Sequence, residues 1–307
     1  PNTVTNKVNL TGDISLKLVN VLKRGELFDL NWKSIQDQTQ SLHTKLNYPF
    51  IFKTNFGLDG QFNLYKLDSS FLELKSSLGV QYFMKGGNYI KVFYQNISSN
   101  VLTQNTSTAS MSNVHTNNYG LGIYRKQMDY IPNPSKGFAI NSSIAIGTRK
   151  SVINDSATTV SSTTYRGEFS IEWLYPISKR HVFYVSNNSA FYYAPTIFQN
   201  ELERFGGQTT QRGFNEQELF SSTKSTISLE YRYLLDKNSR AFLFFDQTWY
   251  ENNAIQYYQD TPFGFGAGFS FGTNIGVFSL SYALGKQFSN PILIRDGKIH
   301  FGYVSYF

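Results

Sequence analysis

The chain has 307 residues, of which 16% are charged and 17% aromatic, with 27 Phe, 21 Tyr and no Cys. The lack of cysteine excludes thiolate metal sites and thiol catalysis, and the lack of any apolar run of roughly 18 residues excludes a membrane protein built of helices. The net charge is +7, but Lys and Arg are scattered without a basic run, which argues against nucleic-acid binding.

Apolar and polar side chains alternate with a period of two along most of the chain. The alternation begins in "LFDLNWK", where Phe28, Leu30 and Trp32 share one face, and returns in "LELKSSLGVQY" and "ISLEYRY". Successive side chains of a β-strand point to opposite faces, so this period indicates strands. A soluble β-sandwich alternates too, but its dry core favours Val and Ile over Phe and Tyr. We therefore predict an all-β transmembrane antiparallel barrel.

Fifteen strands are predicted, in one domain that covers residues 1–307. They span residues 6–19, 27–36, 39–52, 57–69, 71–84, 88–100, 117–129, 137–152, 160–177, 181–194, 220–235, 240–250, 262–273, 275–286 and 298–307. Tight turns such as "KGGN" would lie on the periplasmic side and the longer polar loops outside. Bacterial barrels of one chain usually have an even number of strands. We therefore expect one more strand upstream of Pro1, with or without periplasmic domains before it.

One stretch, "ELERFGGQTTQRGFNEQEL" at residues 201–219, breaks the alternation and cannot be a strand. The glycine pair Gly206 and Gly207 would permit a tight turn, and the isolated Arg212 follows it. A guanidinium inside a barrel needs carboxylate partners that match its fork. A solvated loop arginine is the simpler alternative.

Two acids on the following strands are candidate partners for Arg212. Glu230 shares its strand face with Ser228 and Arg232. Asp246 interrupts the apolar run "AFLFF", where an acid facing lipid would cost several kcal/mol and one facing the lumen much less. We therefore expect both carboxylates to point into the barrel.

The order of elements from this stretch to the C-terminus resembles the BamA and TamA superfamily of outer-membrane assembly factors. "ERFGGQTTQRGF" is followed by a strand with an inward Glu, by "FLFFDQTW", by "GFGAGFSFGTNIGVFSLSYALGK" and by "KIHFGYVSYF". "NVLKRGELFDLNW" and "LNYPFIF" extend the resemblance towards the N-terminus. It implies a sixteen-stranded barrel whose sixth extracellular loop folds back into the lumen. Arg212, Gly213 and Phe214 would form the tip of that loop, and Glu230 and Asp246 would anchor it.

The last strand would form one side of a lateral gate, because in this superfamily the first and last strands pair poorly and open sideways. The gate strand and C-terminal signal comprise His300, Phe301, Gly302, Tyr303 and Phe307. Ser305 departs from the signal, which has an apolar residue there. In the preceding strand, small inward residues are expected to leave room for the inserted loop: Gly264, Gly266, Gly268 and Ser270.

The resemblance implies a protein of the bacterial outer membrane that inserts or translocates other proteins. Its partners would be outer-membrane lipid, unfolded outer-membrane or secreted clients, and accessory subunits, with no nucleic acid. No catalysis and no cofactor are expected. The four histidines, His43, His115, His181 and His300, show no metal-ligand spacing. The alternative is a structural or weakly conducting barrel without insertase activity.

Overall fold

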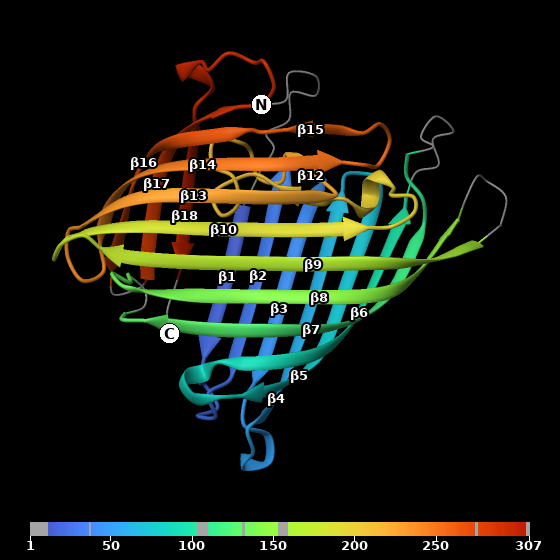
Figure 1. Ribbon diagram of the computed structural model, residues 1–307, viewed down its shortest axis with the longest axis horizontal. Coiled ribbons are helices and arrows are strands. Elements are labelled where there is room, and N and C mark those ends of the chain that lie inside the picture. The colour runs from blue at the N-terminus through green and yellow to red at the C-terminus, as the bar shows by residue number, and fades with distance from the viewer. Residues whose placement is uncertain are drawn as a thin grey trace.

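A computed structural model describes residues 12–36, 38–102, 110–130, 133–152, 159–273 and 276–304. The chain forms one large antiparallel sheet that curls into a barrel (Figure 1). Fifteen strands follow one another along this sheet: β1 (Gly12–Val19), β2 (Leu27–Gln36), β3 (Thr39–Tyr48), β4 (Phe56–Leu67), β5 (Phe71–Phe83), β6 (Tyr89–Val101), β7 (Val114–Met128), β8 (Gly137–Val152), β9 (Thr159–Pro176), β10 (His181–Tyr193), β13 (Thr223–Leu234), β14 (Arg240–Asn252), β16 (Phe263–Thr273), β17 (Gly276–Lys286) and β18 (Lys298–Val304).

Smaller elements lie beside this sheet. The three-residue β15 (Tyr258–Asp260) pairs with β14, and β11 (Glu203–Phe205) pairs with β12 (Leu219–Ser221). Four 3-10 helices complete the secondary structure: η1 (Ile51–Lys53), η2 (Lys85–Gly87), η3 (Gln199–Glu201) and η4 (Ile294–Asp296). Within the described part of the chain, no helix is long and apolar enough to cross a membrane.

The fifteen predicted strands are confirmed, and those at 27–36 and 137–152 agree to the residue. The strand predicted at 39–52 is too long and ends at Tyr48. Pro49 has no N–H for the sheet, and Phe50 and Phe52 then take φ values of 55° and 52°, outside the β region. Residues 6–11 and 305–307 of the predicted first and last strands lie outside the described residues.

The strand walls separate an apolar outer face from a polar interior. On β5 the outward Leu78 is 70% exposed, whereas the inward Glu73 and Gln81 are buried. On β7 the inward Thr116 and Asn118 are also buried. A water-soluble barrel would show the opposite arrangement, so this distribution fits an outer face in contact with lipid and a lumen filled with polar groups.

The two edges of the sheet are β1 and β18. All neighbouring strands are antiparallel, and β1 and β18 are the first and fifteenth of the path, so they run in the same direction (Figure 1). No backbone pairing joins them among the residues that the structure describes. One additional strand between them would be antiparallel to both. With such a strand, the barrel would have an even number of strands, as bacterial barrels of one chain usually do.

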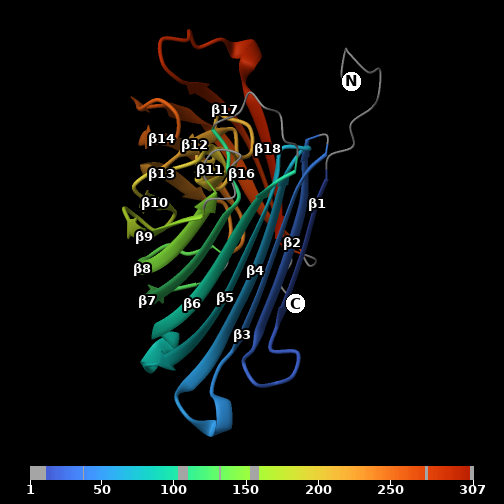
Figure 2. The same ribbon diagram turned by 90° about the vertical axis from the view of Figure 1, so that its right-hand side faces the viewer.

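The connections differ at the two ends of the barrel. The turn end carries the short connections after β1, β3, β5, β7, β9 and β13, and the loop end carries the longer ones after β6, β10, β14 and β17. Residues 194–222, called the inserted loop here, join β10 to β13 and include η3, β11 and β12. Figure 2 shows β11 and β12 within the curve of the barrel wall, and β12 contacts β14.

The two faces of β8 should respond differently to an added charge. Ile144 points outward and is 58% exposed, whereas Asn141 lines the lumen. We expect Ile144→Arg to lower the free energy of unfolding by about 2–4 kcal/mol, because an arginine then faces the bilayer midplane. Asn141→Arg should change it by less than about 1 kcal/mol. Urea titrations in phospholipid vesicles measure both values, and equal losses would contradict a lipid-facing outer wall.

Candidate functional site

The inserted loop turns sharply at its glycines. Gly206, Gly207 and Gly213 have φ values of 121°, 93° and 93°, a region that residues with a side chain rarely adopt. A methyl group at Gly206 would lie 2.5 Å from the Asn215 carbonyl oxygen, and one at Gly207 would overlap the Glu216 side chain. The N–H of Gly207 donates to the Gln211 carbonyl at 3.0 Å and closes the turn. This turn directs the following residue, Arg212, into the barrel.

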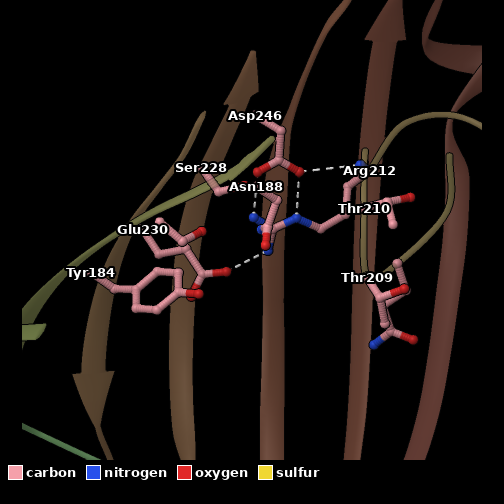
Figure 3. Close-up of a pocket in the computed structure, with 10 residues that line it drawn as sticks. Tyr184, Asn188, Thr209, Thr210, Arg212, Ser228, Glu230 and Asp246 are labelled. Carbon is pink, nitrogen blue, oxygen red and sulfur yellow. Dashed lines mark hydrogen bonds and ion pairs between the residues drawn. The ribbon is translucent and has the colours of Figure 1, made fainter. Parts of the chain in front are cut away.

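Arg212 lies between two carboxylates on neighbouring strands (Figure 3). Its Nε and Nη2 donate to the two oxygens of Asp246 on β14, at 2.7 and 2.6 Å. Its Nη1 donates to Glu230 on β13 at 2.5 Å. The backbone N–H of Arg212 also donates to Asp246, at 3.1 Å, and the guanidinium carbon stacks 3.7 Å from the centre of the Phe244 ring. The hydrogen bonds are all charge-assisted, and the contact with the ring is a cation–π interaction.

The charges in this cluster balance. The second oxygen of Glu230 accepts from Arg232 Nε at 2.7 Å, so two arginines face two acids. Arg212, Glu230 and Asp246 are 8%, 7% and 1% exposed. A cavity of about 110 Å³ with polar walls adjoins them, which is enough room for water. Because the charges are buried, loss of one partner leaves another uncompensated, which costs about 3–5 kcal/mol in a dry site and less where water reaches the remaining charge.

The tip of the inserted loop crosses the inner faces of the last three strands. A methyl group at Gly264 on β16 would lie 1.9 Å from the Arg212 carbonyl oxygen, and one at Gly285 on β17 would lie 2.5 Å from the carbonyl oxygen of Gly213. On β18, His300 Nε2 accepts from the N–H of Gly213 at 3.3 Å. Small residues on two strands therefore allow the backbone of the tip to lie directly against the sheet.

Phe214 completes the tip in an apolar cluster at the loop end. It is 6% exposed and packs with Phe205, Leu219 and Tyr250. Phe205 and Leu219 are opposite one another in the β11–β12 pair. The cluster thus joins the tip of the inserted loop to its own two-stranded base.

The expectation that all the small inward residues of β16 receive the loop is wrong for two of them. A methyl group at Gly266 would meet the carbonyl oxygen of Tyr282 on β17 at 2.0 Å and the ring of Phe244 at 2.9 Å, and one at Gly268 would meet the ring of Phe242 at 2.5 Å. These two glycines make room for aromatic side chains of β14, their neighbour in the sheet. The sequence could not distinguish a space filled by a loop from one filled by an adjacent ring.

The predicted gate residues alternate along β18. His300 is buried and faces the loop tip, whereas Phe301 is 65% exposed on the outer face. A methyl group at Gly302 would lie 2.7 Å from Gln208 Oε1 of the inserted loop. The Tyr303 ring lies 4.7 Å from that of Phe278 on β17. Phe307 lies outside the described residues.

Sequence reasoning missed a second set of ion pairs, which attach the inserted loop to distant parts of the wall. Arg204 donates to Glu73 on β5 at 2.5 Å and stacks 3.7 Å from the Tyr65 ring centre. Arg149 on β8 binds Glu201 in a bidentate manner at 2.8 and 2.7 Å. The alternation marks Glu73 and Arg149 as inward charges, but their partners could not be identified because the path of the loop is needed to find them.

The inserted loop also reaches both edges of the sheet, and the region between the described parts of β1 and β18 is called the seam here. Glu216 pairs with Lys33 on β2 at 3.6 Å, one strand in from the β1 edge. Gly213 and Gln208 contact β18, the opposite edge. The same short segment therefore connects the two ends of the sheet through side chains. Within the described ranges, no cluster of three or more His, Asp or Glu could hold a metal ion.

Comparison with known proteins yields structural matches only. No protein-family model matches the sequence, and no curated protein matches it. BamA from Haemophilus ducreyi lacking POTRA domains 1–3 superposes with a TM-score of 0.63 at 14% identity, covering 96% of this chain and 68% of that one. CdiB from Acinetobacter baumannii gives 0.61 at 16% identity, over 97% and 56% of the two chains. CdiB from Escherichia coli gives 0.63 at 13% identity, over 95% and 58%.

The chain has the fold of the BamA and CdiB barrels. Identities this low establish the fold alone. The chain spans little more than half of the two CdiB chains and about two thirds of the BamA chain. The BamA-type barrel predicted from the motifs at residues 201–219 and in the last strands is therefore confirmed as an architecture.

Removal of the Arg212 side chain should destabilise the barrel. We expect Arg212→Ala to lower the free energy of unfolding by about 3 kcal/mol, because Asp246 and Glu230 lose their shared cation. Arg212→Lys should recover less than half of that loss, because an ammonium cannot form the bidentate fork. Arg180→Ala, on the exposed β9–β10 turn, is the matched control. Urea titration reports all three, and an Arg212→Ala barrel as stable as the control would show that the cluster is not a stabilising contact.

Gly213 should tolerate no side chain because its surroundings are closely packed. Gly87 is the control that distinguishes this packing effect from backbone strain. Both have positive φ, 93° and 77°, but a methyl group at Gly213 would lie 2.8 Å from the Gly285 backbone, whereas nothing lies within 4 Å at Gly87. Gly87→Ala should cost about 1 kcal/mol. Gly213→Ala should cost more and expose residues 201–219 to protease in folded barrels. Equal protease resistance of the two variants would contradict the close packing of the tip.

Proposed function

We propose that this protein is an outer-membrane barrel that inserts or translocates other proteins through the seam between its edge strands. The observation that carries the proposal is the inserted loop. A buried ion cluster holds its tip in the lumen, and the same tip contacts β18 on one side of the seam while Glu216 contacts Lys33 on the other. The fold shared with BamA and CdiB supports this direction.

The seam supplies a physical driving force without covalent chemistry. An unpaired backbone N–H or C=O in hydrocarbon costs several kcal/mol, so an exposed strand edge at membrane depth favours pairing with an incoming strand. Within the described residues, β18 pairs with β17 over seven residues, Lys298 to Val304, and it includes Gly302, which contributes no side chain to packing. Loss of its contacts with the loop would leave the described part of β18 joined to the sheet by its pairing with β17.

The partners follow from this mechanism. Unfolded outer-membrane or secreted proteins would be the clients. Outer-membrane lipid would surround the barrel, and accessory subunits would deliver the clients to it. Arg212, Gly213 and Phe214, with Gly206 and Gly207, would act as the latch. Glu230 and Asp246 would be its anchors, and the last strand would be the gate. No step requires a catalytic residue, a metal or a cofactor.

A second candidate function is a weakly conducting channel. The lumen contains a cavity of about 360 Å³ near the turn end, lined by Lys126, Glu172 and Arg232 among others. Charged and wet lumens conduct ions in other barrels. Under this reading the inserted loop would be a fixed constriction and the seam would stay closed.

A reversible tether between the loop and the gate strand separates the two functions. Gln208 and Gly302 face each other, and the chain has no natural cysteine, so Gln208→Cys with Gly302→Cys places the only thiols at the contact. We expect oxidation to stop the assembly of an unfolded outer-membrane barrel in proteoliposomes, and reduction to restore it. Gln208→Cys alone is the control. Ion conductance with background client assembly in both redox states would favour the channel.

A further inference from the structure

Three neighbouring turns at the turn end expose large apolar side chains. They are the β1–β2 turn (residues 20–26), the β3–β4 turn (49–55) and the β5–β6 turn (84–88), called the amphiphilic rim here. Figure 2 shows the β3–β4 turn projecting furthest from the barrel. The exposed fractions are 62% at Val21, 66% at Leu22, 53% at Phe50, 94% at Phe52 and 44% at Met84. The β9–β10 and β13–β14 turns expose one such side chain each, Ile177 and Leu235.

The rim is also cationic. Lys23, Arg24, Lys53 and Lys85 are all exposed. Glu26 is the single acid in these three segments of the sequence, and its side chain is turned inward, only 5% exposed, where it accepts from the backbone N–H groups of Leu22 and Arg24. The carboxylate of Glu26 is therefore hydrogen-bonded within the turn. The outer surface of the rim presents positive and apolar groups together.

The turns hold these side chains in place. In the β3–β4 turn, Phe50, Phe52 and Lys53 all have positive φ, an uncommon conformation for residues other than glycine. Backbone bonds from Lys53 to Phe50 at 3.2 Å and from Thr54 to Ile51 at 2.9 Å fix it. In the β1–β2 turn, Gly25 donates to Asn20 Oδ1 at 2.7 Å. Ordered turns that keep apolar groups away from the barrel body indicate a surface that contacts something else.

We propose that the amphiphilic rim binds the anionic headgroup layer of the phospholipid leaflet at the turn end. Lys and Arg at a membrane surface each contribute about 1 kcal/mol towards anionic lipid, and apolar or aromatic side chains beside them enter the interface between headgroups and acyl chains.

The lipid-facing wall continues directly into the rim, which favours a membrane over a protein as its occupant. Leu46, Phe56, Leu58 and Ile90 on the adjoining strand ends are 49%, 49%, 52% and 49% exposed. The rim consists of three separate turns that follow one another around the barrel circumference. This arrangement is expected of a surface that contacts a bilayer. Because the first turn belongs to β1, the bound lipid would also lie beside the seam.

Charge reversal on the two ends of the barrel tests the proposal. The rim variant carries Lys23→Glu, Lys53→Glu and Lys85→Glu. The matched control carries Lys150→Glu, Lys286→Glu and Arg295→Glu, the same change in net charge at the loop end. Each full-length chain is folded into phosphatidylcholine vesicles with and without about 30 mol% phosphatidylglycerol, a typical anionic leaflet. Heat-modifiable gel mobility verifies that each variant is folded, and urea titration gives the folded-to-unfolded ratio.

We expect phosphatidylglycerol to raise that ratio roughly tenfold or more for the wild type and the control, and less than about threefold for the rim variant. High salt should reduce the wild-type response, because it screens exposed charges. Equal responses of the two variants would overturn the proposal. A rim variant that keeps the full lipid response but no longer binds a periplasmic protein would also overturn it, since the occupant would then be a protein. The urea titration does not measure client assembly, so the result of this test does not depend on whether the proposed function is correct.

The apolar half of the rim has its own test. Phe52→Trp adds a fluorophore at the most exposed of the five apolar positions, and phosphatidylglycerol with brominated acyl chains quenches emission only on contact. We expect more quenching of this variant than of the wild type, whose own tryptophans are Trp32, Trp173 and Trp249. If brominated lipid does not quench the emission added by the tryptophan at position 52, the turn stays in water, contrary to the proposal.

Discussion

Arg212 can lie inside this barrel only because two carboxylates on adjacent strands enclose it. Transfer of a guanidinium from water into a buried site is costly, and the attraction to Asp246 and Glu230 offsets that cost only when the geometry allows bidentate hydrogen bonding. The structure meets this condition at 2.5 to 2.7 Å. A cluster of this kind adds specificity more than net stability, because a loop outside the lumen would keep its charges hydrated without a desolvation cost.

The other contacts of the tip of the inserted loop lie beside this one. With Arg212 in place, the adjoining backbone lies against Gly264 and Gly285, and Gly213 reaches His300. The base of the loop is attached separately, by Glu201 to Arg149 and by Arg204 to Glu73. In the proposed function, the tip would therefore be released while the base stays attached. This division is what a latch requires, because the freed segment stays close to its binding site.

The open seam and the amphiphilic rim lie on the same part of the barrel. β1 is one edge of the sheet, and its turn is the first of the three rim turns. A seam that opens sideways exposes backbone groups to lipid, and the position of the bilayer around it determines which groups are exposed. Charged and apolar turns that fix the depth of the barrel would keep that position constant while strands pair and separate.

The sequence alone determined the strands, the inward direction of Glu230 and Asp246, and the place where the pattern stops being a strand. These are local properties: a period of two decides which face a residue occupies, and paired glycines identify a turn. Only the tertiary structure decided which inward charges meet. Glu73 and Arg204 are 131 residues apart, and Gly268 accommodates a ring whereas Gly264 accommodates the backbone of the inserted loop. Such pairings depend on strand register, barrel curvature and the path of the loop, which are set by the whole sheet and leave no signal at either residue.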